Sequence, residues 1–162
     1  MRTFRTMARG AALAAGLLLA GGALAADIEI KAPWSRATAK GATVGAGYLT
    51  IVNKGSAPDR LVAATADVAE KAEVHEMAMD NGAMTMRALS DGLDIKPGES
   101  VTLKPGGLHL MLTGLKQPLV QGGVIHVTLT FAKAGPITAA LPIGVLGATG
   151  PAPAEDAPTI NY

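Results

Sequence analysis

The sequence predicts an all-β fold, built as an antiparallel β-sandwich or barrel. After residue 26, short runs of β-forming residues recur along the chain, and clusters of glycine and proline separate them. Asn81-Gly82 stands between two such runs, and this dipeptide is the strongest short-range signal for a tight hairpin. No segment after residue 26 repeats its apolar residues with the period of a long amphipathic helix.

Nine strands are expected, and turn residues separate most of them. In chain order they span 27–31, 43–53, 60–66, 72–80, 83–89, 100–104, 108–113, 124–132 and 137–146. The breaks fall at residues 97–98, 105–107, 114, 121–123 and 135–136, all of which are rich in glycine or proline. This rhythm is typical of an antiparallel sandwich or barrel.

Two segments are expected to lie outside this fold. Residues 1–26 combine three arginines with an apolar run that ends in Ala23-Leu24-Ala25, which is the pattern of a secretory signal peptide. The run is too short for a membrane span, so we expect an exported protein without a stable membrane anchor. Residues 150–162 are poor in core-forming residues and are expected to form a loose tail, which leaves one domain at 27–149.

Composition excludes several classes of function. Removal of the three leader arginines changes the formal net charge from +1 to −2, so the basic surface that nucleic-acid binding requires is absent. The sequence contains no cysteine. A blue-copper electron carrier, a thiol oxidoreductase and most structural zinc sites are therefore excluded.

Alternation predicts which side chains face the core. Leucines occupy positions 108, 110 and 112 of one expected strand, and apolar residues occupy positions 125, 127, 129 and 131 of another. By parity, His109 and Met111 point away from the leucine face. His126 lies on the less apolar side of its strand and has no methionine near it, which indicates a surface or hydrogen-bonding histidine. Trp34 and Tyr48 are expected to be core or rim aromatics.

Methionine and histidine gather in one part of the chain. Five methionines follow the leader, and all lie in a window that also holds two of the three histidines: His75, Met77, Met79, Met84, Met86, His109 and Met111. If Asn81-Gly82 is a two-residue loop, Met79 faces Met84, Met77 faces Met86 and His75 faces Ala88. One surface of the hairpin then carries the histidine and four methionines, and a slip of one residue would separate them.

These side chains are the protein ligands that suit monovalent copper. Thioether sulfur and imidazole nitrogen are both uncharged when they bind, and a site built from them holds copper(I) without a thiol. Methionine is also a common filler of hydrophobic cores, so packing is the competing interpretation, above all for Met79 and Met84 near the hairpin tip.

The chain resembles the PCu(A)C family of periplasmic copper chaperones over nearly all of its length after residue 26. The resemblance rests on five motifs, at residues 32–37, 45–49, 74–77, 84–87 and 104–112. It implies a cupredoxin-like β-sandwich or barrel of Greek-key type. It also implies that His75, Met86, His109 and Met111 bind copper(I), with Met77, Met79 and Met84 as secondary candidates. The implied recipient is the copper centre of a respiratory cytochrome oxidase, served together with a Sco-type thiol protein.

Three classes of function are compared on these grounds. A copper(I) carrier without catalysis is favoured, because no nucleophile and base pair and no phosphate-binding motif is visible. A periplasmic copper redox protein, or a copper-resistance or storage protein, is the alternative. Oxidative chemistry beside exposed thioethers would convert them to sulfoxides, which argues against the redox form. A structural β-sandwich whose methionines only pack is the third class.

Overall fold

Ten β-strands form the part of the chain that the computed structural model describes, residues 27–152. They are β1 (Ile28–Arg36), β2 (Val44–Asn53), β3 (Asp59–Ala66), β4 (Ala69–Asp80), β5 (Ala83–Ala88), β6 (Leu93–Ile95), β7 (Ser100–Leu103), β8 (Leu108–Leu115), β9 (Val124–Phe131) and β10 (Gly135–Gly144). All ten lie inside the predicted domain of 27–149. The expected signal peptide, 1–26, and residues 153–162 of the expected tail lie outside the described residues.

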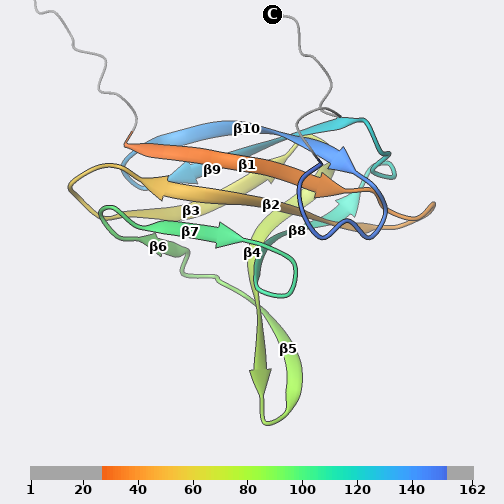
Figure 1. Cartoon of the computed structure of the whole chain (residues 1–162), viewed down its shortest axis with the longest axis horizontal. Coiled ribbons are helices and arrows are strands. Elements are labelled where there is room, and N and C mark those ends of the chain that lie inside the picture. Colours follow the sequence, from red (N-terminus) through yellow and green to blue (C-terminus); the bar gives the residue numbers. More distant parts are fainter. Residues whose placement is uncertain (1–26, 153–162) are drawn as a thin grey trace, which may run out of the picture.

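Seven of the strands close into a barrel. Their order around the ring is β4, β8, β2, β1, β10, β9 and β3, and the pairing of Ala64 with Ala72 joins β3 back to β4. The remaining three are attached at its margins, β5 to β4, β6 to β3 and β7 to β2. In Figure 1 the end of β4 and the whole of β5 extend away from the other strands. The predicted all-β fold is confirmed.

One pairing in the ring differs from the purely antiparallel arrangement that the sequence predicts. β1 and β10 run parallel, with Ser35 beside Ile143 and Arg36 beside Gly144, whereas the other six pairings of the ring are antiparallel. The reason is geometric. Seven is an odd number, so strand direction cannot alternate all the way around a closed ring, and at least one neighbouring pair must be parallel.

All nine predicted strands are present, with changes at their ends. The first continues to Arg36 and does not end at residue 31 as predicted. An irregularity between Lys31 and Trp34, with Ala32 at a φ of 45°, accommodates Pro33 without breaking the pairing to β2. The last strand ends at Gly144 and not at residue 146. Strand β6 was not predicted, because three residues are too few to show alternation.

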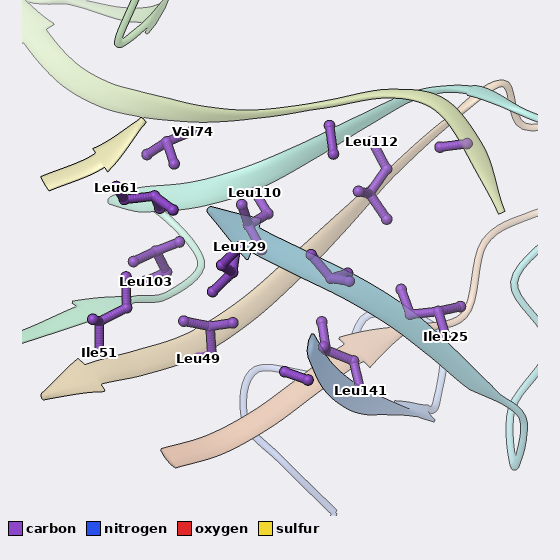
Figure 2. Close-up of a cluster of buried hydrophobic side chains, with 14 of the residues drawn as sticks. Leu49, Ile51, Leu61, Val74, Leu103, Leu110, Leu112, Ile125, Leu129 and Leu141 are labelled. Carbon is purple, nitrogen blue, oxygen red and sulfur yellow. The ribbon is translucent and has the colours of Figure 1, made fainter. Parts of the chain in front are cut away.

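The core fills the barrel interior with aliphatic side chains from facing strands (Figure 2). Leu110 and Leu112 of β8 are fully buried, and Leu108 is partly buried. The four predicted core positions of β9, residues 125, 127, 129 and 131, are all buried. The predicted alternation is therefore confirmed on both strands, and it turns the intervening residues of β8 toward the outer side of the wall.

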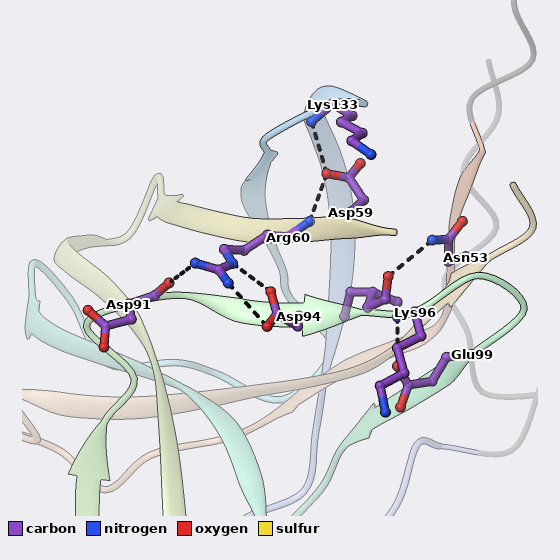
Figure 3. A network of polar contacts seen from close by, with 9 residues as sticks. Asn53, Asp59, Arg60, Asp91, Asp94, Lys96, Glu99 and Lys133 are labelled. Carbon is purple, nitrogen blue, oxygen red and sulfur yellow. Dashed lines mark hydrogen bonds and ion pairs between the residues drawn. The ribbon is translucent and has the colours of Figure 1, made fainter. Parts of the chain in front are cut away.

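A buried carboxylate ties the start of β3 to the turn between β9 and β10. Asp59 accepts hydrogen bonds from the backbone N–H groups of Arg60, Lys133 and Ala134, at 2.7, 2.9 and 2.9 Å. Burial alone would raise the pKa of Asp59, but these N–H groups stabilise its charged form and bring the pKa below its usual value. Figure 3 shows this contact beside the ion pair of Arg60 with Asp94 on β6.

No helix long and apolar enough to cross a bilayer occurs in residues 27–152.

Candidate metal site

The β4–β5 hairpin has the register that its turn predicts. Asn81 and Gly82 adopt φ angles of 48° and 80°, as a tight two-residue turn with two left-handed positions requires. The cross-strand partners are Met79 with Met84, Met77 with Met86, and His75 with Ala88. These partners share one face of the ribbon, so four methionines follow His75 along a single surface.

Strand β8 brings the second histidine directly beside the first. His75 and His109 are cross-strand neighbours in the β4–β8 pairing, and their ring centroids lie 6.0 Å apart. Met111 is the next residue on the same face of β8, opposite Glu73. The β4–β8 pairing therefore brings the two histidines together on one surface.

A hydrogen bond to the backbone fixes the orientation of the His109 ring. Its side chain is only 6% exposed, and Nδ1 lies 3.0 Å from the carbonyl oxygen of Gly107. A carbonyl can only accept, so Nδ1 carries a proton, and in the neutral ring the lone pair then lies on Nε2. Fixing one ring nitrogen in this way is the usual means by which proteins present the other to a metal. Gly107 lies in the turn before β8, whose Gly106 has a φ of 79°.

His75 is a half-buried histidine, and neither of its ring nitrogens is hydrogen-bonded. Nδ1 and Nε2 are both inaccessible and have no hydrogen-bond partner among the described residues. The nearest carboxylate oxygen, Oε2 of Glu73, is 3.8 Å from Nε2, which is too long for a hydrogen bond. Leaving such a group unsatisfied costs about 1 to 3 kcal/mol. A metal bound to one nitrogen would remove part of this cost.

The methionines divide into an inner and an outer group. Met111 and Met77 are half-buried and line the same cavity as His109. Met86 lies across the ribbon from Met77 and is 49% exposed. Met79 and Met84, nearer the turn, are 66% and 54% exposed. The core-filling interpretation therefore fails for the three exposed methionines, because their side chains contribute to no core.

A cavity of about 350 Å³ opens beside His109 and Met111. Its wall includes Arg36 and Tyr48, whose guanidinium and ring stack at 5.3 Å, and the Tyr48 ring packs against Trp34 at 4.4 Å. Both aromatics are buried, as expected for core or rim residues. Sequence reasoning did not identify Arg36 as part of the site. The one local hint was that Arg36 lies two residues after Trp34 and so shares its face of the strand. The cavity itself could not be predicted, because it forms only when β8, β2 and β1 lie side by side.

The third histidine is separate from this cluster. His126 lies on β9, where its side chain is exposed and Nδ1 is 3.2 Å from Oδ2 of Asp67. Its own backbone N–H donates to the other oxygen of that carboxylate. The predicted role as a surface, hydrogen-bonding histidine is confirmed.

The donor set available at the cluster is soft. Among residues 27–152, no group of three or more His, Cys, Asp or Glu side chains lies close enough to hold a metal ion. The soft donors that lie beside His75 and His109 are the thioethers of neighbouring methionines, among them Met77 and Met111. Uncharged nitrogen and sulfur ligands favour a soft monovalent ion over a hard divalent one.

Comparison with known proteins identifies the family. The chain matches the family described as "Putative lipoprotein LpqE-like" over residues 28–143. It belongs to this LpqE-like family. Among curated proteins it is similar to "Putative lipoprotein Lxx21020" of Leifsonia xyli subsp. xyli (strain CTCB07), with 36% identity over 122 residues, 75% of this chain and 72% of the relative.

Solved structures of PCuAC proteins share the fold. The copper-bound PCuAC domain from PmoF2 is 28% identical, with a TM-score of 0.62, over 74% of this chain and 94% of that domain. Apo-DR1885 from Deinococcus radiodurans is 25% identical, with a TM-score of 0.58, over 90% of this chain and 97% of that protein. The predicted PCu(A)C membership and cupredoxin-like all-β fold are thus confirmed. The PCuAC family consists of copper-binding chaperones and not of enzymes.

Proposed function

We propose that this protein binds one copper(I) ion through His75, Met86, His109 and Met111 and carries it in the periplasm. The observation that carries the proposal is the pair of neighbouring histidines. One has its ring orientation fixed by a backbone carbonyl, and the other is half-buried with both ring nitrogens inaccessible and without a hydrogen-bond partner. Two half-buried or exposed thioethers on the same face supply the remaining soft ligands.

The charge of the donor set supports the monovalent state. Two neutral imidazoles and two thioethers leave the full charge of the ion uncompensated, and this costs less for copper(I) than for copper(II). A solved relative is described as CuI-DR1885, which is 25% identical with a TM-score of 0.53. That protein holds the copper(I) form, in keeping with the same assignment here.

The site is also suited to releasing its ion. Met86 is half exposed, and the cavity beside His109 and Met111 is open, so a partner's ligands can approach before the protein's own ligands leave. The names of the family and of the Leifsonia relative refer to lipoproteins, which supports export, in agreement with the expected signal peptide. The recipient that the family resemblance implies is the copper centre of a respiratory cytochrome oxidase, with a Sco-type thiol protein as co-donor.

Anaerobic competition with a copper(I) chelator tests binding. The parent protein should withdraw one equivalent, and His109→Ala should lose more than about 100-fold in affinity, since loss of a mere supporting contact to a ligand already costs 10- to 100-fold. His126→Ala is the matched control, because it removes an imidazole that lies outside the cluster. Equal affinity in the parent and His109→Ala would contradict the proposal.

A second comparison tests which methionine on the hairpin binds. Met86→Leu and Met77→Leu remove one thioether each from opposite sides of the same cross-strand pair. The proposed ligand set predicts that Met86→Leu weakens copper(I) binding more than Met77→Leu does. The reverse order would indicate that Met77 on β4, and not Met86 on β5, is the ligand.

Delivery is tested in a strain that lacks the gene. Cytochrome oxidase activity should fall at low copper and should return with the parent gene but not with the His109→Ala gene. Normal oxidase activity together with increased sensitivity to copper would instead assign the protein to copper resistance or storage.

A further inference from the structure

Met79 and Met84 form an exposed thioether pair beyond the proposed copper site. They are direct cross-strand partners one pair from the turn, and each exposes more than half of its side chain. Their Cβ atoms are therefore about 4.5 to 5.5 Å apart on the same face of the ribbon. Two long, unbranched side chains starting from this separation can direct their sulfur atoms toward one ion.

We propose that Met79 and Met84 form a second, outer site for a soft monovalent metal ion, from which the ion passes inward to the histidine pair. Binding at the outer site stands on its own observations. The inward transfer rests on the function proposed above. The step is a ligand exchange without change of oxidation state, in which a new thioether bond to the ion forms as an old one breaks.

The spacing along the hairpin is suited to stepwise movement. The outer pair is followed by the pair of Met77 and Met86, and then by the level of His75. Positions on the same face of a strand recur about every 6.6 to 6.8 Å, so each pair is one such interval from the next. An ion shared between neighbouring pairs therefore needs side-chain rotation and no movement of the backbone.

Exposure distinguishes the outer pair from the inner ligands. Residues 83–88 of β5 are all exposed, and the hairpin extends away from the barrel, so a donor molecule can reach Met79 and Met84 before the histidines (Figure 1). The outer site has only two thioethers and no imidazole, so it binds more weakly than the inner one. Weak binding at the outside and stronger binding inside is the order that drives an ion inward.

Silver(I) titration with NMR detection of ¹³C-methyl-labelled methionine tests the outer site. Silver(I) is a soft monovalent ion, and it serves as a probe because it does not change oxidation state during the titration. The first equivalent should shift the methyl signal of Met111, and further equivalents should shift those of Met79 and Met84. Methyl signals of Met79 and Met84 that stay unmoved at excess silver(I) would overturn the proposal.

Separate variants of the outer methionines and of the inner histidines test the outer site independently of the proposed copper(I) site. Met79→Leu/Met84→Leu should keep the first equivalent of silver(I), lose the weaker one, and take up copper(I) more slowly from a chelator. Thr85→Ala, on the opposite face of the same hairpin, is the matched control and should behave like the parent. In His75→Leu/His109→Ala the outer signals should still shift, so failure of the inner site leaves the outer site measurable. A double leucine variant that retained the weaker equivalent would overturn the outer site, and uptake as fast as in the parent would overturn the inward transfer.

Discussion

The barrel wall and the β4–β5 hairpin contribute proposed ligands of opposite character. On the wall, His75, His109 and Met111 are buried or half-buried between packed strands, and a backbone carbonyl fixes one imidazole. On the hairpin, Met79, Met84 and Met86 are largely exposed and touch no core. One strand, β4, belongs to both regions, because its first half closes the barrel and its second half pairs with β5.

In the proposed function, this difference lets one site both hold and exchange a copper(I) ion. Buried ligands in fixed orientations lose little conformational entropy on binding, which strengthens affinity. Exposed thioethers on a two-stranded ribbon are adaptable and accessible, which favours ligand exchange with a partner. We therefore assign tight binding of the ion to the residues of the wall, and its exchange with a partner to the residues of the hairpin.

Removal of a core side chain behind the site should have the largest effect. Leu110 lies between His109 and Met111 and is fully buried on the opposite face of β8, so Leu110→Ala should lower the free energy of unfolding by about 2 to 5 kcal/mol. Met84→Ala, on the hairpin, should change it by less than about 0.5 kcal/mol. Chemical denaturation measures both, and equal losses would remove the contrast between the two regions.

Replacement of the unpartnered histidine should separate affinity from stability. His75→Leu removes a proposed ligand, so copper(I) affinity should fall by more than about 100-fold, or about 2.8 kcal/mol. It breaks no hydrogen bond, because neither ring nitrogen has one, so the metal-free protein should unfold no more easily than the parent. Chelator competition measures the affinity, and thermal unfolding of the same metal-free samples measures the stability. A large loss of stability would indicate that His75 is chiefly structural.

The buried carboxylate of the barrel should make stability depend on acidity. The pKa of Asp59 is lower in the folded state than its ordinary value of 3.8, so the unfolded chain takes up the proton first as the pH falls. Its contribution is therefore complete above that value and is lost as the pH falls through the folded pKa. Asp59→Asn should cost about 1 to 3 kcal/mol at pH 7 and less in acid. Denaturation curves at pH 7 and pH 3 test this, and an equal cost at both would contradict it.

A substitution in the hairpin turn should lower the affinity for copper(I) more than it lowers the stability of the barrel. Gly82 has a φ of 80°, so Gly82→Ala places a Cβ in a left-handed position at a cost of about 1 to 2 kcal/mol. That cost falls on the exposed ribbon and should weaken the hold of Met86 on copper(I), while the barrel remains folded. Ser100→Ala, at an exposed position of β7, is a control at the far end of β2. Unchanged copper(I) affinity in Gly82→Ala would mean that the hairpin contributes no ligand.

Local pattern was enough to predict much of this protein. Alternation identified nine of the ten strands and the buried residues of β8 and β9, because side chains on a strand alternate between its faces. Asn81-Gly82 determined the register of the hairpin, and therefore which methionines share its face with His75. These features depend only on residues close together in the chain.

The tertiary structure decided what local pattern cannot encode. Alternation shows which face a residue occupies but not which strand lies beside it, so the contact of His75 with His109 required the pairing of β4 with β8. The same holds for the parallel β1–β10 pair, for the cavity wall at Arg36, and for the placing of Met77 inside and Met86 outside. The parallel pair follows from closing a barrel with an odd number of strands. The other features follow from which strands become neighbours, and this depends on packing across the whole chain and not on any one segment.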